Sequence, residues 1–233
     1  METLLLPGMD GTGRLFASLE HHLAPDLRAR VVAFPPDQPR SYAKLIGEIA
    51  VPTGPFAIVA ESFSGPLGIR LATRYPDQVL ALVLVATFVR NPSSVARWVQ
   101  AWLGSHLFRV RLPDVALRLG LLGMDAADDE VNDLRAALLS VEPAVLAGRL
   151  REIVSVDVSQ EFAAGKAPVL YIAGGRDRLV GPRVFAQMKR LRPDMEIRML
   201  DAPHLVLQRR PLEAARLISE FLLPKKGPGT PRP

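Results

Sequence analysis

The chain has 233 residues, 48% hydrophobic and 23% charged, which suits a soluble globular protein of one domain, with or without an insertion. Its formal net charge of +5 is spread along the chain without a basic block, so a nucleic-acid-binding surface is not indicated. It contains no cysteine, which excludes disulfides and thiolate metal sites.

The first residues of this sequence do not predict a signal peptide. Residues 1–7 include no basic residue, and their apolar run is too short for a signal peptide. No stretch approaches the roughly 20 apolar residues of a membrane span. We therefore expect a cytoplasmic location and no membrane span, and a signal peptide removed before this sequence begins is the open alternative.

Short apolar segments that predict strands alternate with helix-length segments. Several strand segments are apolar without alternation, which is typical of strands buried on both faces of a parallel sheet. Strand-helix alternation predicts βαβ units and an α/β fold with a mostly parallel sheet flanked by helices. The expected strands are 3–6, 30–34, 56–60, 80–86, 168–173 and 196–200, and the expected helices of this core are 12–23, 41–50, 65–74, 182–191 and 207–221.

The first expected strand runs into a glycine-rich loop, residues 7–13. A loop of this kind before a helix can cradle a phosphate. However, it lacks the lysine of a Walker loop, and the spacing of Gly8, Gly11 and Gly13 does not fit G-x-G-x-x-G. Asp10 could cap the following helix or hold the loop.

The third expected strand ends in Ala60-Glu61-Ser62-Phe63-Ser64-Gly65. A strand that ends in small-x-Ser-x-small and enters a helix resembles a nucleophile elbow, with Ser62 as the nucleophile. Ala60 and Ser64 replace the two usual glycines, so the match is looser than G-x-S-x-G. Ser64 is the alternative nucleophile, but it would lie deeper in the helix, and we reject it. A serine at this place is more often only a helix N-cap.

Residues 90–165 interrupt the alternation with helical patterns at 94–107, 114–121, 128–139 and 143–154. One interpretation is a helical subdomain with its own core. We favour a cap over a functional site, because the insertion follows a strand on the side where loops build sites. Trp98 and Trp102 are candidate substrate-binding residues in this cap, although a core position is an equal alternative.

An acid and a histidine follow late in the chain. Asp177 comes after the strand 168–173 and the Gly174-Gly175 turn, and His204 lies in a loop before the last helix. The other histidines are His21, His22 and His106, and none of them lies beyond Asp177. With Ser62 first, the order is Ser, Asp, His, which predicts the catalytic triad Ser62, Asp177 and His204.

Together these segments resemble the α/β-hydrolase superfamily from Leu4 to about Leu222. The resemblance implies an oxyanion hole made by the backbone N–H groups of Met9 and Phe63. There is no room before Leu4 for the two leading antiparallel strands of many members, so we expect about six strands. The expected organisation is a hydrolase core at 1–89 and 166–223, a helical cap at 90–165 and a disordered tail at 224–233.

A serine at the elbow disfavours dehalogenation and epoxide opening, which use aspartate in this superfamily. We therefore expect a serine esterase that cleaves carboxylic esters through an acyl-enzyme on Ser62, without metal or cofactor. The partner would be a small acyl ester or thioester. A thioesterase or an acyltransferase with the same triad is the first alternative, and a non-catalytic binding protein on this scaffold is the second. The sequence does not set the acyl chain length or the oligomeric state.

Overall fold

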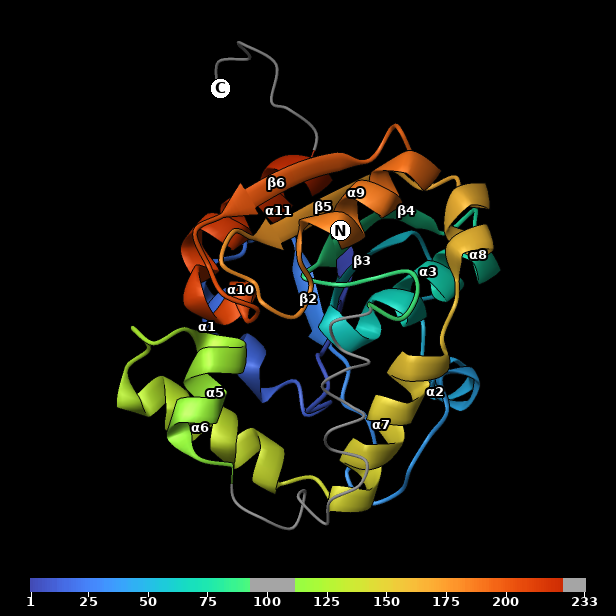
Figure 1. The fold of residues 1–233 in the computed structure, drawn as a ribbon. Coiled ribbons are helices and arrows are strands. Elements are labelled where there is room, and N and C mark those ends of the chain that lie inside the picture. The colour runs from blue at the N-terminus through green and yellow to red at the C-terminus, as the bar shows by residue number, and fades with distance from the viewer. Residues whose placement is uncertain (93–111, 224–233) are drawn as a thin grey trace.

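The computed structural model describes residues 1–92 and 112–223. Its centre is a six-stranded sheet with the strand order β2-β1-β3-β4-β5-β6, in which all paired neighbours run parallel (Figure 1). The predicted parallel sheet of about six strands is therefore confirmed. The strands are β1 Glu2–Leu6, β2 Arg28–Val31, β3 Phe56–Glu61, β4 Val79–Val85, β5 Val169–Gly174 and β6 Glu196–Leu200.

Burial along the strands follows their place in the sheet. All six residues of the central strand β3 are buried, because helices cover both of its faces. The two edge strands β2 and β6 carry exposed charged residues instead, such as Arg28 in β2 and Glu196 in β6. Charges on an edge strand discourage pairing with another chain.

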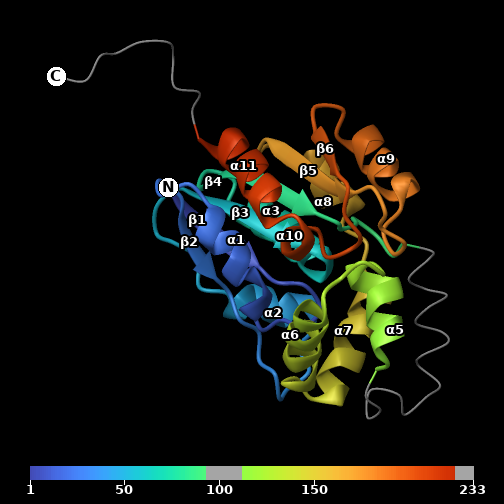
Figure 2. The ribbon, with the colours of Figure 1, turned by 90° about the vertical axis from the view of Figure 1, so that its left-hand side faces the viewer.

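Helices cover both faces of the sheet (Figures 1 and 2). Buried side chains of one face form a core with α1 (Ala17–His22), α10 (Val206–Arg209) and α11 (Pro211–Leu222). The opposite face packs on α2 (Tyr42–Glu48), α3 (Gly65–Arg74), α8 (Ser159–Ala164) and α9 (Pro182–Leu191).

The segment between β4 and β5 supplies a further group of helices. They are α5 (Asp114–Leu117) with a wider turn at Arg118–Leu122, α6 (Asp128–Leu139) and α7 (Pro143–Ser155). Both views show them gathered at one end of the sheet (Figures 1 and 2). In the described part of this segment, the β pairing is a single bridge between Arg90 and Asp157. Helix α8, which the sequence analysis did not expect, buries Phe162 in the main core.

Most element boundaries differ from the sequence prediction by one or two residues, and three differences have a clear physical reason. Strand β2 ends at Val31, because Phe34 N–H donates to Gly11 O (2.7 Å) and the chain leaves the sheet. The first helix begins later than residue 12, after Gly11 and Gly13 with positive φ. The last helix is split into α10 and α11 at Pro211.

Some sequence predictions fall outside the described residues. These are the helix at 94–107 with Trp98, Trp102 and His106, and the tail at 224–233. Within residues 1–92 and 112–223, no helix combines the length and the hydropathy that a membrane span requires.

Candidate active site

Ser62 begins a tight 3₁₀ turn, Ser62–Ser64, between β3 and α3. Its φ of +49° lies in the left-handed region, which is uncommon for a non-glycine residue and is a form of strain found at functional sites. The close approach of strand and helix is made possible by Gly65 and Gly68. A Cβ at Gly68 would lie 2.9 Å from the Cβ of Ala60, and one at Gly65 would overlap Thr87. Gly68 therefore leaves the room that the side chain of Ala60 occupies.

The three residues of the predicted triad lie in hydrogen-bond contact. Ser62 Oγ is 2.8 Å from His204 Nε2, and His204 Nδ1 is 2.8 Å from Asp177 Oδ2. The side chains of His204 and Asp177 are only 5% and 1% exposed. In the tautomer with hydrogen on Nδ1, His204 donates to Asp177 and can accept the Ser62 proton.

Backbone groups fix the carboxylate of Asp177. Its Oδ1 accepts hydrogen bonds from the N–H groups of Leu179 (2.8 Å) and Val180 (2.9 Å). The other oxygen, Oδ2, is thereby left facing His204. Because these amides hold the carboxylate, it can orient the imidazole without first reorganising.

The loops that carry Asp177 and His204 are hydrogen-bonded to each other and contact the helical segment between β4 and β5. Arg176 N–H donates to Ala202 O (2.9 Å), which links the Asp177 loop to the loop before His204. Leu205 N–H donates to Leu121 O (3.1 Å) in the turn after α5. The Asp125 carboxylate pairs with Arg176 (3.2 Å), directly before Asp177. Residues 121–125 therefore lie beside two of the three triad loops.

The charge on His204 is governed by opposing effects. Burial lowers the pKa of His204, but the adjacent Asp177 carboxylate, its hydrogen bond and the charge of Glu61 raise the pKa of His204 above its ordinary value overall. A raised pKa favours the imidazolium, which is the form an imidazole takes after it has accepted a proton.

Glu61 is a site residue that the sequence analysis did not single out. It is 2% exposed, and its Oε2 accepts a hydrogen bond from Gln208 Nε2 (3.2 Å). Among the described residues, its Oε1 has no partner. Burial is the main cause that raises the pKa of Glu61 to about 7. The sequence did contain a signal for Glu61, because it is a charged residue at the end of an otherwise wholly apolar strand.

The glycine-rich loop brings Met9 to the elbow. Gly11 N–H donates to Gly8 O (3.0 Å), which closes a turn around Met9 and Asp10. The N–H of Met9 donates to no acceptor in the described part of the chain. Asp10 holds the loop rather than capping the helix, because its Oδ2 accepts from Thr12 N–H (3.0 Å). Met9 and Phe63 thus remain the predicted oxyanion donors.

Ser64, the rejected alternative nucleophile, has a different partner. Its side chain is fully buried, and its hydroxyl donates to the carbonyl of Pro7. Ser64 therefore ties the elbow to the glycine-rich loop and does not face His204. His21 and His22 are exposed at the end of α1.

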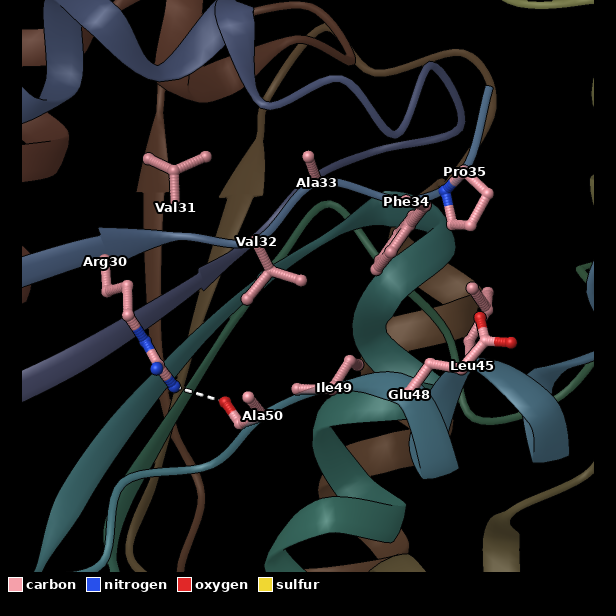
Figure 3. Close-up of a pocket in the computed structure, with 10 residues that line it drawn as sticks. All are labelled: Arg30, Val31, Val32, Ala33, Phe34, Pro35, Leu45, Glu48, Ile49 and Ala50. Carbon is pink, nitrogen blue, oxygen red and sulfur yellow. Dashed lines mark hydrogen bonds between the residues drawn. The ribbon is translucent and has the colours of Figure 1, made fainter. Parts of the chain in front are cut away.

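A pocket with a volume of about 220 Å³ lies elsewhere, between the end of β2 and α2 (Figure 3). Its lining runs from Arg30 to Pro35 and continues with Leu45 and Glu48 of α2 and with Ile49 and Ala50 just after it. Arg30 donates to Ala50 O at one side of this pocket. None of the triad residues lines it. In the described part of the chain, no three His, Asp or Glu side chains gather as a metal site requires.

Comparison with known sequences gives consistent matches. A family profile described as alpha/beta hydrolase fold matches residues 48–210. A pimeloyl-[acyl-carrier protein] methyl ester esterase of Xanthomonas campestris pv. campestris (strain B100) is 33% identical over 196 residues, which cover 76% of this chain and 77% of that protein. Lipase LipV of Mycobacterium tuberculosis is 27% identical and covers 95% of this chain and 93% of its own length.

Solved structures agree in fold. The enol-lactonase from Burkholderia xenovorans LB400 superposes with a TM-score of 0.79 at 19% identity, covering 95% of this chain and 90% of that one. A lipase-esterase related protein from Clostridium acetobutylicum superposes with a TM-score of 0.77 at 14% identity, covering 95% and 94%. At such identities the likeness concerns the architecture alone.

Proposed function

This chain belongs to the α/β-hydrolase family, and from that membership and the contacts of Ser62 we propose that it is a serine hydrolase that cleaves carboxylic esters. One observation carries the proposal. The serine at the elbow, the imidazole and the carboxylate form one continuous hydrogen-bonded series, with both contacts at 2.8 Å. This is the arrangement that activates a serine hydroxyl.

Acylation of Ser62 uses all of these groups. His204 Nε2 takes the Ser62 proton while Oγ attacks the acyl carbon, and Asp177 stabilises the resulting imidazolium. The N–H groups of Met9 and Phe63 bind the oxyanion. When the tetrahedral intermediate collapses, the bond to the alcohol oxygen breaks, and His204 gives its proton to that oxygen. In deacylation, water attacks the acyl carbon while His204 Nε2 takes its proton, the bond from that carbon to Ser62 Oγ breaks, and His204 returns the proton to Oγ as the carboxylic acid leaves.

The helical segment is proposed to act as a cap over this site. Its residues 121–125 contact the loops of Asp177 and His204, and α7 contacts the glycine-rich loop through Arg149. An apolar cluster of this segment includes Leu205, the neighbour of His204. These contacts support a cap that shields the acyl group from water. A cytoplasmic location also remains a prediction.

The substrate proposed is an ester of a small alcohol. Its support is that the curated relatives at 30–33% identity are named as methyl ester esterases. Thioesterase and acyltransferase activities remain alternatives, since an acyl-enzyme on Ser62 serves all three.

The test compares matched esters and thioesters of the same acyl group, with and without an added alcohol acceptor. We expect faster ester hydrolysis and labelling of Ser62 by a fluorophosphonate probe. Faster thioester cleavage or net acyl transfer would favour the alternatives. No labelling and no turnover would favour a non-catalytic binding protein.

A further inference from the structure

Helix α7 reaches the glycine-rich loop through Arg149, a residue that takes no part in the triad. Arg149 is only 3% exposed. Its Nη1 donates to Met9 O (2.9 Å) and to Asp10 O (2.7 Å), and its Nη2 donates to Pro35 O (3.0 Å). The guanidinium also lies 5.7 Å from the centre of the Phe34 ring. The fixed geometry of a guanidinium allows it to hold several carbonyl groups at once.

The loop is shaped to receive this side chain. A Cβ at Gly11 would lie 2.5 Å from Arg149 Nη1, so the glycine leaves the room that the guanidinium occupies. Burial lowers the pKa of Arg149 to about 10, which still leaves it charged at neutral pH. A buried charge of this kind is tolerated because three of its five N–H groups donate to backbone carbonyls.

The same helix is connected to the elbow by a second route. Glu152, three residues after Arg149, accepts a hydrogen bond from Tyr42 N–H (2.7 Å) at the start of α2. The Tyr42 hydroxyl donates to Phe63 O (2.8 Å), and the two rings stack with centroids 4.7 Å apart. Helix α7 therefore contacts Met9 directly through Arg149, and it reaches Phe63, the residue with the other proposed oxyanion donor, through Tyr42.

We propose that α7 sets the relative position of the two oxyanion donors, with Arg149 positioning Met9 and Tyr42 positioning Phe63. This inference rests on the proposed esterase function. The Gly8–Gly11 hydrogen bond fixes the peptide plane before Met9, and Arg149 fixes the planes after Met9 and Asp10. An oxyanion hole works only when its donors are already in place as charge develops, so these contacts contribute to catalysis without touching substrate.

The inference predicts a loss confined to the transition state. Without the Arg149 contacts, kcat should fall by about 10- to 100-fold, because misplacement of a reacting group by about 1 Å costs rate on this scale. KM should change little, since a ground-state carbonyl gains little from the oxyanion hole. The affinity for a trifluoromethyl ketone, which forms a tetrahedral oxyanion on Ser62, should fall in parallel with kcat.

The experiment uses three variants of the full chain and one matched control. Arg149→Met removes the contacts, Arg149→Lys retains charge but not the planar fork, and Tyr42→Phe removes one hydroxyl while keeping the stacked ring. Arg151→Met removes an exposed arginine of the same helix. Rates are expressed per active site, counted by complete fluorophosphonate labelling, so that unfolded protein does not contribute.

We expect kcat to rank as wild type and Arg151→Met, then Tyr42→Phe and Arg149→Lys, then Arg149→Met. If Arg149→Met does not fold, the other two variants decide by the same criteria. Variants with kcat and trifluoromethyl ketone affinity within twofold of an active wild-type enzyme would overturn this inference alone. A wild-type protein with no ester hydrolysis would overturn the proposed function, and this inference with it.

Discussion

Gly174, the last residue of β5, packs directly against the carbonyl oxygen of Pro203, the residue before His204. A Cβ at position 174 would lie 2.7 Å from Ala202 O and nearer still to Pro203 O. This contact brings the loop of Asp177 against the loop of His204. The lack of a side chain at Gly174 therefore allows the close approach of the two loops whose Asp177 and His204 side chains are hydrogen-bonded.

Gly174→Ala should separate these two loops. We expect kcat/KM to fall by about 10- to 100-fold, because the Asp177–His204 contact is lengthened. Steady-state hydrolysis of a p-nitrophenyl ester measures the effect. Gly181→Ala is the matched control, since a Cβ there would meet no atom within 4 Å. Equal activity of both variants would show that the loops adjust without cost.

Ser62→Ala should abolish turnover while the fold is retained. Loss of the nucleophile in a triad commonly lowers kcat by about 10⁴- to 10⁶-fold. Ser64→Ala removes only the hydrogen bond to Pro7 O, for which we expect a loss of about 1 kcal/mol in unfolding free energy and a much smaller loss of rate. Rates and urea unfolding of both variants separate the two roles. Retention of activity in Ser62→Ala, with its loss in Ser64→Ala, would reverse the assignment.

The pH dependence of kcat/KM should report the neutral form of His204. Only neutral imidazole can accept the Ser62 proton, so activity should rise with pH through the pKa of His204. Because this pKa is raised, the rise should lie at a higher pH than the ordinary pKa of histidine. Asp177→Asn removes the charge that raises this pKa. It should therefore move the rising limb to lower pH while lowering the plateau rate severely. A limb that does not move would show that Asp177 does not act on His204.

The positions of the three triad residues after strands made them predictable from the sequence. Ser62, Asp177 and His204 each follow a strand, and parallel strands bring their carboxyl ends to one edge of the sheet. Chain order and strand position were therefore enough to predict three side chains that lie in contact. Their catalytic roles, and those of Met9 and Phe63, remain predictions.

Arg149 is a residue near the site that chain order and strand position do not predict. It lies on the buried face of α7 with Val145, Leu146, Leu150 and Ile153, so a charge within an apolar helical pattern was a visible signal. Its partners are the backbone carbonyls of Met9, Asp10 and Pro35. Every residue has a backbone carbonyl, so the residue types of the partners do not identify them. The contact therefore could not be predicted from the sequence.

The proposed cap should select acyl chains by length. Its described helices carry an apolar cluster that includes Leu205, next to His204. Because each buried CH₂ contributes roughly 0.8 kcal/mol, kcat/KM should rise by up to about fourfold per carbon until the pocket is full. A series of p-nitrophenyl esters measures this. Replacing Trp98 or Trp102 with alanine should shift the preferred length but spare Ser62 labelling if either lines the wall. Equal rates for all chain lengths would argue against the cap.

Glu61→Gln should alter how stability depends on pH. The pKa of Glu61 is about 7 in the fold, raised from 4.5 chiefly by burial. Between these values the folded protein holds a proton that the unfolded chain has released, so the stability linked to this proton is lost as pH rises through the window. Glutamine carries no charge at any pH and can still bond to Gln208. The variant should therefore match wild type near pH 5 and exceed it near pH 8 by on the order of 3 kcal/mol.

Urea unfolding of wild type and Glu61→Gln at a series of pH values measures this difference. Glu20→Gln, at an exposed position on α1, is the matched control and should run parallel to wild type throughout. The variant should also move the rising limb of kcat/KM to lower pH, because the charge of Glu61 raises the pKa of His204. Stability curves of wild type and Glu61→Gln that remain parallel from about pH 5 to 8 would show that Glu61 stays ionised. The buried carboxyl beside the nucleophile would then be a permanent charge near His204 and not a group that titrates with the enzyme.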